Sequence, residues 1–383
     1  MNATISMHGK MRALAMAAGA DVLIAMSPAN FAYVAKTYIL TVELIRLRQA
    51  FAIISCCSEP SLLVCNIEQA QVARESWIKD VRAYTEFAEN PIEALIDLIR
   101  DKGFSRARIG LELSYLPAID QRRFVEGLPE ALIVDVSDVL GRERAVKNRC
   151  DLAKLEIAAK ATHAAVTDAM AIARRGESEK VMADRILAML IANGADGTLF
   201  TVFGSGRRSA LTHGLPTARI PKESEIIRLD VGGRFGPWLS DLARTYSTGH
   251  PSKSQCHVYR ALREIQEETL SHIRPGVPAE AIFFACRQAF QKRRLQFHMP
   301  HVGHGLGLEL HESPILRPGD TTTLQPGMVL NVEPLALDSR NHLYHIEDLV
   351  VITQKGYRLL TPGLAPKNIP IIGEKQHDSA SGA

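Results

Sequence analysis

The stretch that decides the fold is Val302-Gly303-His304-Gly305-Leu306-Gly307-Leu308-Glu309-Leu310-His311-Glu312-Ser313-Pro314. Two acidic segments follow it, Val332-Glu333-Pro334 and His345-Ile346-Glu347-Asp348. Upstream, two further acids stand in apolar surroundings. The candidate ligands are thus one imidazole and four carboxylates: His304, Asp230, Asp241, Glu333 and Glu347. Because this set suits two hard-to-borderline divalent cations, we predict a dinuclear metal site.

Composition places the chain among ordinary globular proteins. It has 383 residues, of which 46% are hydrophobic and 23% charged, enough for two domains with buried cores. The net charge of +3 is too small to indicate a nucleic-acid partner. Six cysteines without CxxC spacing predict free thiols and a reducing, cytoplasmic location. No apolar stretch reaches the length that crosses a bilayer, so we expect no membrane partner.

Residues 1–145 alternate helical and short apolar strand patterns, which predicts a smaller α/β domain. A helix should precede a strand at Val22–Met26, because Asp21 interrupts the apolar run that resembles a signal peptide. Further on we expect strands at 50–54, 61–64, 108–111 and 132–136 and a helix at 91–100. The charged stretch 141–151 then leads into a long helix, where we place the start of a second domain, 150–370. Residues 371–383 are expected to form a disordered tail.

The second domain contains an internal sequence repeat. A long helix ends near Gly176 and another near Gly276, 100 positions later, and a second helix follows each glycine. The first acid of each later pair, Asp230 or Glu333, follows its glycine by 54 or 57 positions. Two such units facing each other would bring four carboxylates to a shared centre. We therefore predict an α/β (α+β) domain with a pseudo-twofold duplication and a metal site on its axis.

Each acidic pair is expected on a β-hairpin. The strand-like run 225–231 is followed by a turn-rich segment and returns over 239–247, which can place Asp230 beside Asp241. The same reasoning applies to 328–335 and 343–353. Ionised carboxylates this close repel and desolvate one another unless a cation neutralises them.

Taken singly, these residues have ordinary alternatives. A lone Asp in a hairpin is usually a turn or surface residue, and His213 or His304 can be simple loop histidines. His298 and His301 are at most supporting residues. Competing motifs fail on spacing, since His311-Glu312 lacks the second His of an HExxH helix and the glycines do not fit GxGxxG. The recurrence of acids in both halves is what favours the metal site.

The quoted motifs resemble the pita-bread metallopeptidases, in the branch of Xaa-Pro dipeptidases, Xaa-Pro aminopeptidases and creatinases. The matching pattern is Asp230, ten intervening residues, Asp241, Gly303 to Pro314, the PGMV run to Pro334, and Ile346-Glu347-Asp348. The resemblance covers residues 150 to 365 and implies a C-terminal pita-bread domain after a creatinase/prolidase-like N-terminal domain. It also implies a homodimer.

By position, the resemblance implies that Asp230 binds one metal, that Asp241 and Glu347 bridge both, and that His304 and Glu333 bind the other. His213 and His311 match the two active-site histidines that contact the substrate, and Glu333 would also relay a proton. The implied cofactors are two divalent ions, manganese first, with cobalt, zinc or iron as alternatives. A metal-bridging hydroxide would then attack an amide carbon.

The chain departs from the family pattern where substrate is chosen. Ile315 stands where prolidases carry Arg, His345 replaces an Arg two residues before Glu347, and Leu335-Ala336-Leu337 replaces a Gly-aromatic segment. Arg317 or Arg340 can substitute as a carboxylate anchor. The main expectation is an Xaa-Pro peptidase acting on a small peptide, of dipeptidase or aminopeptidase P type. Two alternatives stay open: a relative acting on a non-peptide small metabolite, as an ectoine-hydrolase-like C–N hydrolase or lyase, and a noncatalytic binding module.

Overall fold

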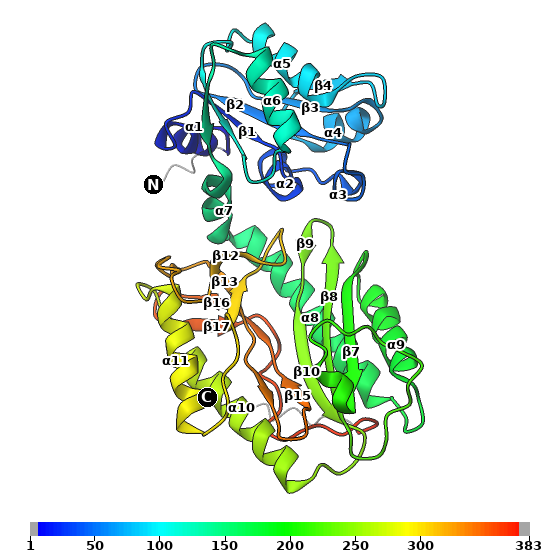
Figure 1. Ribbon diagram of the computed structural model, residues 1–383. Helices are drawn as coiled ribbons and strands as arrows, with labels where there is room; N and C mark the ends of the chain where they lie inside the picture. Colours follow the sequence, from blue (N-terminus) through cyan, green and yellow to red (C-terminus); the bar gives the residue numbers. More distant parts are fainter. Residues whose placement is uncertain (1–6, 375–383) are drawn as a thin grey trace. The chain divides into compact units, whose positions relative to one another are not determined.

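The computed structural model describes residues 7–374, and its chain divides into two compact units, Met1–Arg144 and Ala145–Ala383 (Figure 1). Each unit has a sheet and a hydrophobic core of its own.

The first unit is built on a six-stranded mixed sheet with the order β4-β3-β2-β1-β5-β6. Its strands are β1 (Val22–Ala25), β2 (Phe51–Ser55), β3 (Ser61–Cys65), β4 (Asp80–Tyr84), β5 (Arg108–Leu111) and β6 (Leu132–Asp135). Its helices are α1 (Met7–Ala17), α2 (Pro28–Ala35), α3 (Leu40–Leu44), η1 (Asn66–Glu68), α4 (Gln69–Glu75), α5 (Pro91–Asp101), α6 (Ala118–Gly127) and α7 (Ser137–Ala145). Helix α5 shows how sequence sets a boundary, because Asn90 caps it by accepting from Ile92 N and Glu93 N, and Pro91 occupies its first turn. The expected strands and the 91–100 helix are all present.

Over residues 145–374, the second unit contains three sheets. Their orders are β10-β8-β7 with β9 paired to β8, β12-β11-β13-β16-β17, and β14-β15. The strands are β7 (Gly197–Ser205), β8 (Ile226–Phe235), β9 (Trp238–Leu239), β10 (Leu242–Ser247), β11 (Gly303–Gly305), β12 (Glu312–Ile315), β13 (Val329–Val332), β14 (Leu335–Leu337), β15 (Leu343–His345), β16 (Asp348–Ile352) and β17 (Tyr357–Leu359). The helices are α8 (Arg149–Ala171), α9 (Glu179–Ala192), η2 (Gly206–Ala210), α10 (Lys253–Ser271) and α11 (Ala279–Lys292).

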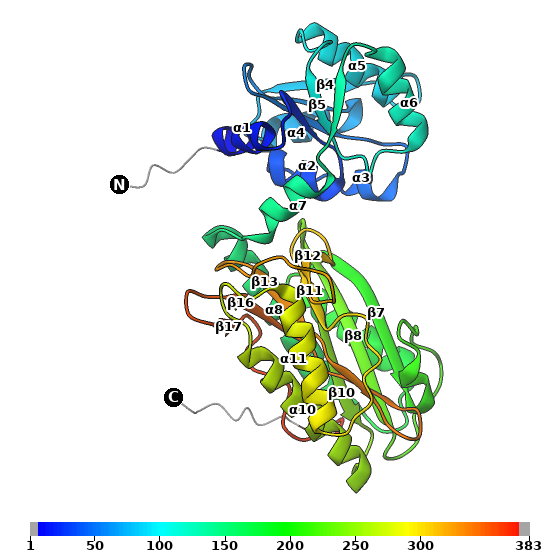
Figure 2. The same ribbon diagram turned by 60° about the vertical axis from the view of Figure 1, so that its left-hand side comes forward.

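The predicted duplication is visible in this unit. Helices α8 and α9 precede the first sheet, and α10 and α11, which lie side by side in Figures 1 and 2, precede the second. Both long helices start with a capping box, formed by Asn148 in α8 and Ser252 in α10. Both turns that follow them need glycine, since φ is +89° at Gly176 and +86° at Gly276. The α/β architecture with a pseudo-twofold repeat is confirmed.

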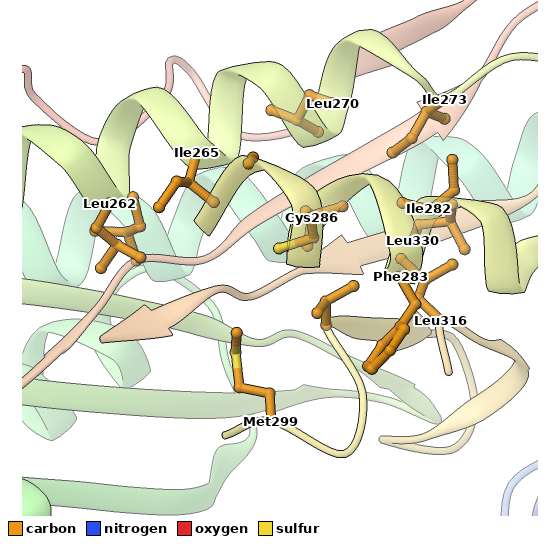
Figure 3. Close-up of a cluster of buried hydrophobic side chains, with 14 of the residues drawn as sticks. Leu262, Ile265, Leu270, Ile273, Ile282, Phe283, Cys286, Met299, Leu316 and Leu330 are labelled. Carbon is orange, nitrogen blue, oxygen red and sulfur yellow. The ribbon is translucent and has the colours of Figure 1, made fainter. Parts of the chain in front are cut away.

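A hydrophobic core holds the second half of this unit in place (Figure 3). This core includes Leu262 and Ile265 of α10, Cys286 of α11 and Leu330 of β13. Each fully buried aliphatic side chain contributes about 1.5–3 kcal/mol relative to exposure. Because β13 leads directly to Glu333, this packing also fixes the position of one candidate ligand.

The end of the described chain differs from expectation. The tail predicted for 371–383 is wrong in its first residues, because Ile372 N donates to Ser247 O at 3.0 Å and Gly373 N to Met170 O at 2.9 Å. Ile371 forms a bridge to Ser247 of β10, so these residues extend the first sheet. Residues 375–383 lie outside the described part of the chain.

Two expectations about composition can be examined directly. All six cysteines are free thiols. Across residues 7–374, every helix falls short of the length and apolar character that a membrane span requires.

Candidate metal centre

The first sheet contributes two acids through one hairpin. Asp230 lies within β8, and Asp241 immediately precedes β10, which runs antiparallel to β8 with Ala243 opposite Asp230. The turn is held by Ser240, whose hydroxyl accepts from Gly233 N at 3.0 Å. The hairpin return thus brings the two carboxylates together, as the pattern of apolar residues predicted.

The second sheet contributes the remaining three residues. His304 is the middle residue of β11, Glu333 directly follows β13, and Glu347 directly precedes β16. Strand β11 runs between β12 and β13 so closely that a Cβ at Gly303 would lie 2.1 Å from Asn331 O. Only glycine permits this approach, which explains the residues flanking His304.

One backbone hydrogen bond joins the two halves at the centre. Glu347 N donates to Ala243 O at 3.1 Å, so the second hairpin lies against the first. Beneath this contact, Arg244 and Asp348 form a buried ion pair with an Nη2–Oδ1 distance of 2.6 Å. Gln266 and Thr361 also donate to Asp348. This satisfied network holds the strands that carry Asp241 and Glu347.

The candidate ligands converge. One ligand atom each from Asp241, His304 and Glu347 lie within 4.8 Å of one another, and all three residues are buried. His304 Nε2 lies 3.7 Å from Asp241 Oδ2 and 3.4 Å from Glu333 Oε1. Asp230 completes the group as an electrostatic neighbour of Asp241 and Glu347. Side chains on or next to five strands of the first two sheets thus come together.

Within residues 7–374, the atoms that face the centre have no hydrogen-bond partner. They are Asp230 Oδ1, Asp241 Oδ1, His304 Nε2, Glu333 Oε1 and Glu347 Oε2, all buried. His304 Nδ1 lies 3.0 Å from Gly305 O, which requires a proton on Nδ1 and leaves the Nε2 lone pair facing the carboxylates. A lone pair aimed at anions fits a cation between them, so these residues fit a divalent metal.

The electrostatics of the protein alone lead to the same conclusion. Burial, followed by repulsion from neighbouring acids, raises the pKa of Asp241 and of Glu347 well above the usual range. Burial also lowers the pKa of His304, which keeps the ring neutral. Glu333 is the exception: burial opposes its ionisation, yet the rings of His301 and His345 hold its pKa below the usual range.

The predicted histidines have different surroundings. The ring of His311 stacks on that of His304 with centroids 3.8 Å apart, and burial lowers the pKa of His311 to about 4. The side chains of His311 and His213 are both exposed, and His213 lies on the loop after η2. His301 Nδ1 lies 3.2 Å from Glu333 Oε1, while His298 contacts Gln296.

Sequence reasoning missed two cations near the centre. Arg228, within β8 and only 1% exposed, donates to Asp230 Oδ2 at 2.9 Å. Lys147 forms a fully buried ion pair with Glu312, the residue after His311. Arg228 could have been noticed, because it is a charged residue inside the apolar run Ile226-Ile227-Arg228-Leu229. Nothing in the local sequence marks Lys147.

Within residues 7–374, none of the buried atoms without a hydrogen-bond partner comes from Ile315, Arg317 or Arg340. Ile315 is half-buried in β12, and its N–H donates to Asp320 Oδ2 at 2.8 Å. Arg317 and Arg340 are both exposed.

Two family models match the chain. A sequence model of metallopeptidase family M24 matches residues 153–354, and a model of the creatinase/prolidase N-terminal domain matches residues 8–146. Because the first match spans more than half of the chain, the chain belongs to metallopeptidase family M24. The resemblance stated from the motifs is confirmed.

Individual relatives agree with this assignment. The uncharacterized peptidase YqhT of Bacillus subtilis is 28% identical over 312 residues, covering 78% of this chain and 88% of that protein. The Xaa-Pro dipeptidase of Pyrococcus furiosus is 30% identical over 228 residues, covering 59% of this chain and 66% of that protein. The crystal structure of X-Pro aminopeptidase from Thermotoga maritima shares the fold, with a TM-score of 0.84, 23% identity, and coverage of 95% and 99% of the two chains.

Proposed function

We propose that this protein hydrolyses the peptide bond before proline in small peptides, using two divalent metal ions. The observation that carries the proposal is the buried cluster of ligand atoms that lack protein partners, on a chain of the M24 family. The similarity to Xaa-Pro dipeptidases supports the choice of substrate. The same similarity favours a peptidase over a hydrolase or lyase of non-peptide metabolites, and the complete ligand set disfavours a noncatalytic module.

The ions would be held by Asp230, Asp241, His304, Glu333 and Glu347. When bound, two divalent ions supply an activated water and polarise the scissile carbonyl. Manganese is the expected ion, since four carboxylates and one imidazole suit hard-to-borderline cations. Cobalt, zinc and iron are the alternatives to be compared.

The protein's own residues would carry the remaining steps. His311 is neutral above about pH 5, because the pKa of its ring is about 4, and it can donate one N–H to the developing oxyanion. Glu333 Oε1 can accept the proton of the attacking water and pass it to the leaving nitrogen. His213, exposed on its loop, would contact the substrate after it binds.

The length of the substrate depends on a carboxylate anchor. Ile315 cannot bind a free carboxylate, and Arg317 and Arg340 are exposed rather than held at the centre. We therefore propose that longer Xaa-Pro peptides are cleaved at least as well as dipeptides.

The experiment is a comparison of substrates on one manganese-loaded preparation. Ala-Pro, Ala-Pro-Ala-Ala and the control Ala-Ala-Ala-Ala are incubated with the protein, and released alanine is quantified by mass spectrometry. The proposal expects cleavage of the two proline peptides only. Two bound ions per chain without turnover of either proline peptide would refute it, as would faster hydrolysis of N-acetyl amino acids.

Two further properties are proposed. Exposed apolar side chains of the first unit, Leu47 and Phe87, line a common pocket and support an interface in a homodimer. Six free cysteines support a reducing, cytoplasmic location. Light scattering after size-exclusion chromatography tests the first property, with a monomer mass of 42.1 kDa as the contrary result.

A further inference from the structure

Arg228 lies where one candidate ligand, Asp230, meets His345 and the loop that carries His213. Its Nη2 donates to Asp230 Oδ2 at 2.9 Å and lies 3.1 Å from His345 Nδ1. Its Nη1 donates to the carbonyl of Thr212, directly before His213. A single buried guanidinium therefore contacts three segments of the site.

The imidazole beside it is fixed by a second residue of the same sheet. Thr245 is the register partner of Arg228 across β8 and β10. Its hydroxyl accepts from His345 N and donates to His345 O, both at 2.9 Å. The backbone of His345 is thus anchored directly over Arg228.

This contact determines the tautomer of His345. A guanidinium has only donors, so the Nδ1 that faces it must be an acceptor. In the neutral ring the proton is then on Nε2, which lies 3.7 Å from Glu333 Oε2. The other oxygen of Glu333, Oε1, lies 3.4 Å from His304 Nε2. At 3.7 Å the Nε2–H is too far from Oε2 for a hydrogen bond and attracts this oxygen electrostatically, while Oε1 faces His304.

We propose that Arg228 is a positioning residue that acts through His345, fixing the Nε2–H tautomer and thereby the orientation of the Glu333 carboxylate. The same guanidinium holds Asp230 and the carbonyl before His213, so the ligands and the substrate loop share one anchor. The effect on catalysis rests on the proposed function, whereas the tautomer and the metal affinity do not.

The first test is nitrogen NMR of protein labelled with 15N-histidine, both metal-free and loaded with diamagnetic zinc. The His345 signals are assigned by their loss in His345→Gln. We expect the Nε2–H tautomer in the wild-type protein and a mixed or reversed tautomer in Arg228→Met. An Nδ1–H tautomer in the wild type, or the same tautomer after Arg228→Met, would overturn the proposal.

The second test leaves Arg228 in place, because Arg228→Met removes a buried charge and can fail to fold. Glutamine at 345 can accept from Arg228 and donate to Glu333, whereas leucine can do neither. Manganese affinity is measured by calorimetry. His345→Leu is expected to weaken it by about 10- to 100-fold, the usual effect of losing such a supporting partner. His345→Gln should recover most of this loss, and Arg175→Met, an exposed arginine paired with Glu223, should bind like the wild type.

The kinetic result separates this inference from the proposed function. On a proline peptide, His345→Leu should lower kcat more than it changes KM, with recovery in His345→Gln. Equal manganese affinity in the leucine and glutamine variants would refute the positioning role, even in an active enzyme. If the wild type cleaves no proline peptide, the proposed function fails, while the NMR and calorimetry results still decide the role of Arg228.

Discussion

Replacing Glu347 by glutamine should have opposite effects on the metal-free and the metal-loaded protein. Glu347 is 1% exposed, and its Oε1 accepts from Asn331 Nδ2 while its Oε2 has no protein partner. Burial and repulsion from Asp241 raise the pKa of Glu347. Glutamine keeps the shape and the Asn331 contact, removes the charge, and can donate to Asp241.

The size of each effect follows from burial. An unsatisfied buried polar group destabilises a fold by about 1–3 kcal/mol. Because the glutamine amide is uncharged and can donate to Asp241, the substitution should stabilise the metal-free protein by about that amount. For a unit of this size, a change of about 1 kcal/mol in stability shifts the thermal unfolding midpoint by roughly 2–4 °C. The midpoint of the metal-free variant should therefore lie about 2–12 °C above that of the wild type. Manganese at 100 times its Kd should stabilise the wild type by about 2.7 kcal/mol, or roughly 5–11 °C, and this gain should be lost in the variant.

The assay is thermal unfolding at pH 7.5 of chelator-treated protein titrated with manganese. Glu223→Gln, an exposed glutamate paired with the exposed Arg175, is the matched control and should resemble the wild type in both series. The reasoning is refuted if metal-free Glu347→Gln melts below the wild type, or if manganese raises the midpoint of both proteins equally.

Other consequences concern pH, catalysis and stability. Because the pKa values of Asp241 and Glu347 are raised in the folded protein, the unfolded chain releases these protons first. The free energy of unfolding of the metal-free protein should therefore fall as the pH rises above about 4, until the folded groups ionise. The decrease is up to about 1.4 kcal/mol per pH unit for each of the two protons. Between pH 5 and 7, the thermal unfolding midpoint of chelator-treated protein should fall relative to that of metal-loaded protein. A difference between the two midpoints that stays constant over this range would contradict the reasoning. His311→Ala should lower kcat by about 10²–10³-fold if its N–H stabilises the oxyanion. The wild-type pH profile should show no titration of His311 between pH 6 and 8, because its pKa is about 4, and one assigned to it there would contradict its surroundings. Lys147→Met should destabilise the protein by about 3–5 kcal/mol in urea unfolding, because it leaves the buried Glu312 carboxylate without its cation. Lys147→Met/Glu312→Gln should recover much of that loss, and strictly additive effects of the two changes would argue against coupling.

Much of the centre followed from local sequence. An acid inside an apolar strand followed by a turn-rich segment predicted that Asp230 and Asp241 share a hairpin, and β8 and β10 pair accordingly. The second hairpin is more complex, since β13 pairs with β16 while β14 pairs with β15 in a separate sheet. Alternating polarity predicts strands and their return, but the split between sheets depends on packing that sequence does not reveal.

Contacts between distant residues were beyond sequence reasoning. Arg228 and His345 are 117 positions apart, and Lys147 and Glu312 are 165 positions apart. Neither residue of a pair indicates its partner, because ion pairs and hydrogen bonds between elements depend on tertiary register. From the sequence, His345 was noticed only because it stands where many family members carry an arginine. In the structure, Arg228 of β8 places a guanidinium next to His345.

Anomalous scattering from crystals of the manganese-loaded protein tests the central claim most directly. Data collected at the manganese edge should show two peaks per chain, surrounded by Asp230, Asp241, His304, Glu333 and Glu347. Peaks elsewhere, or no peak among these side chains at saturating manganese, would contradict the dinuclear centre.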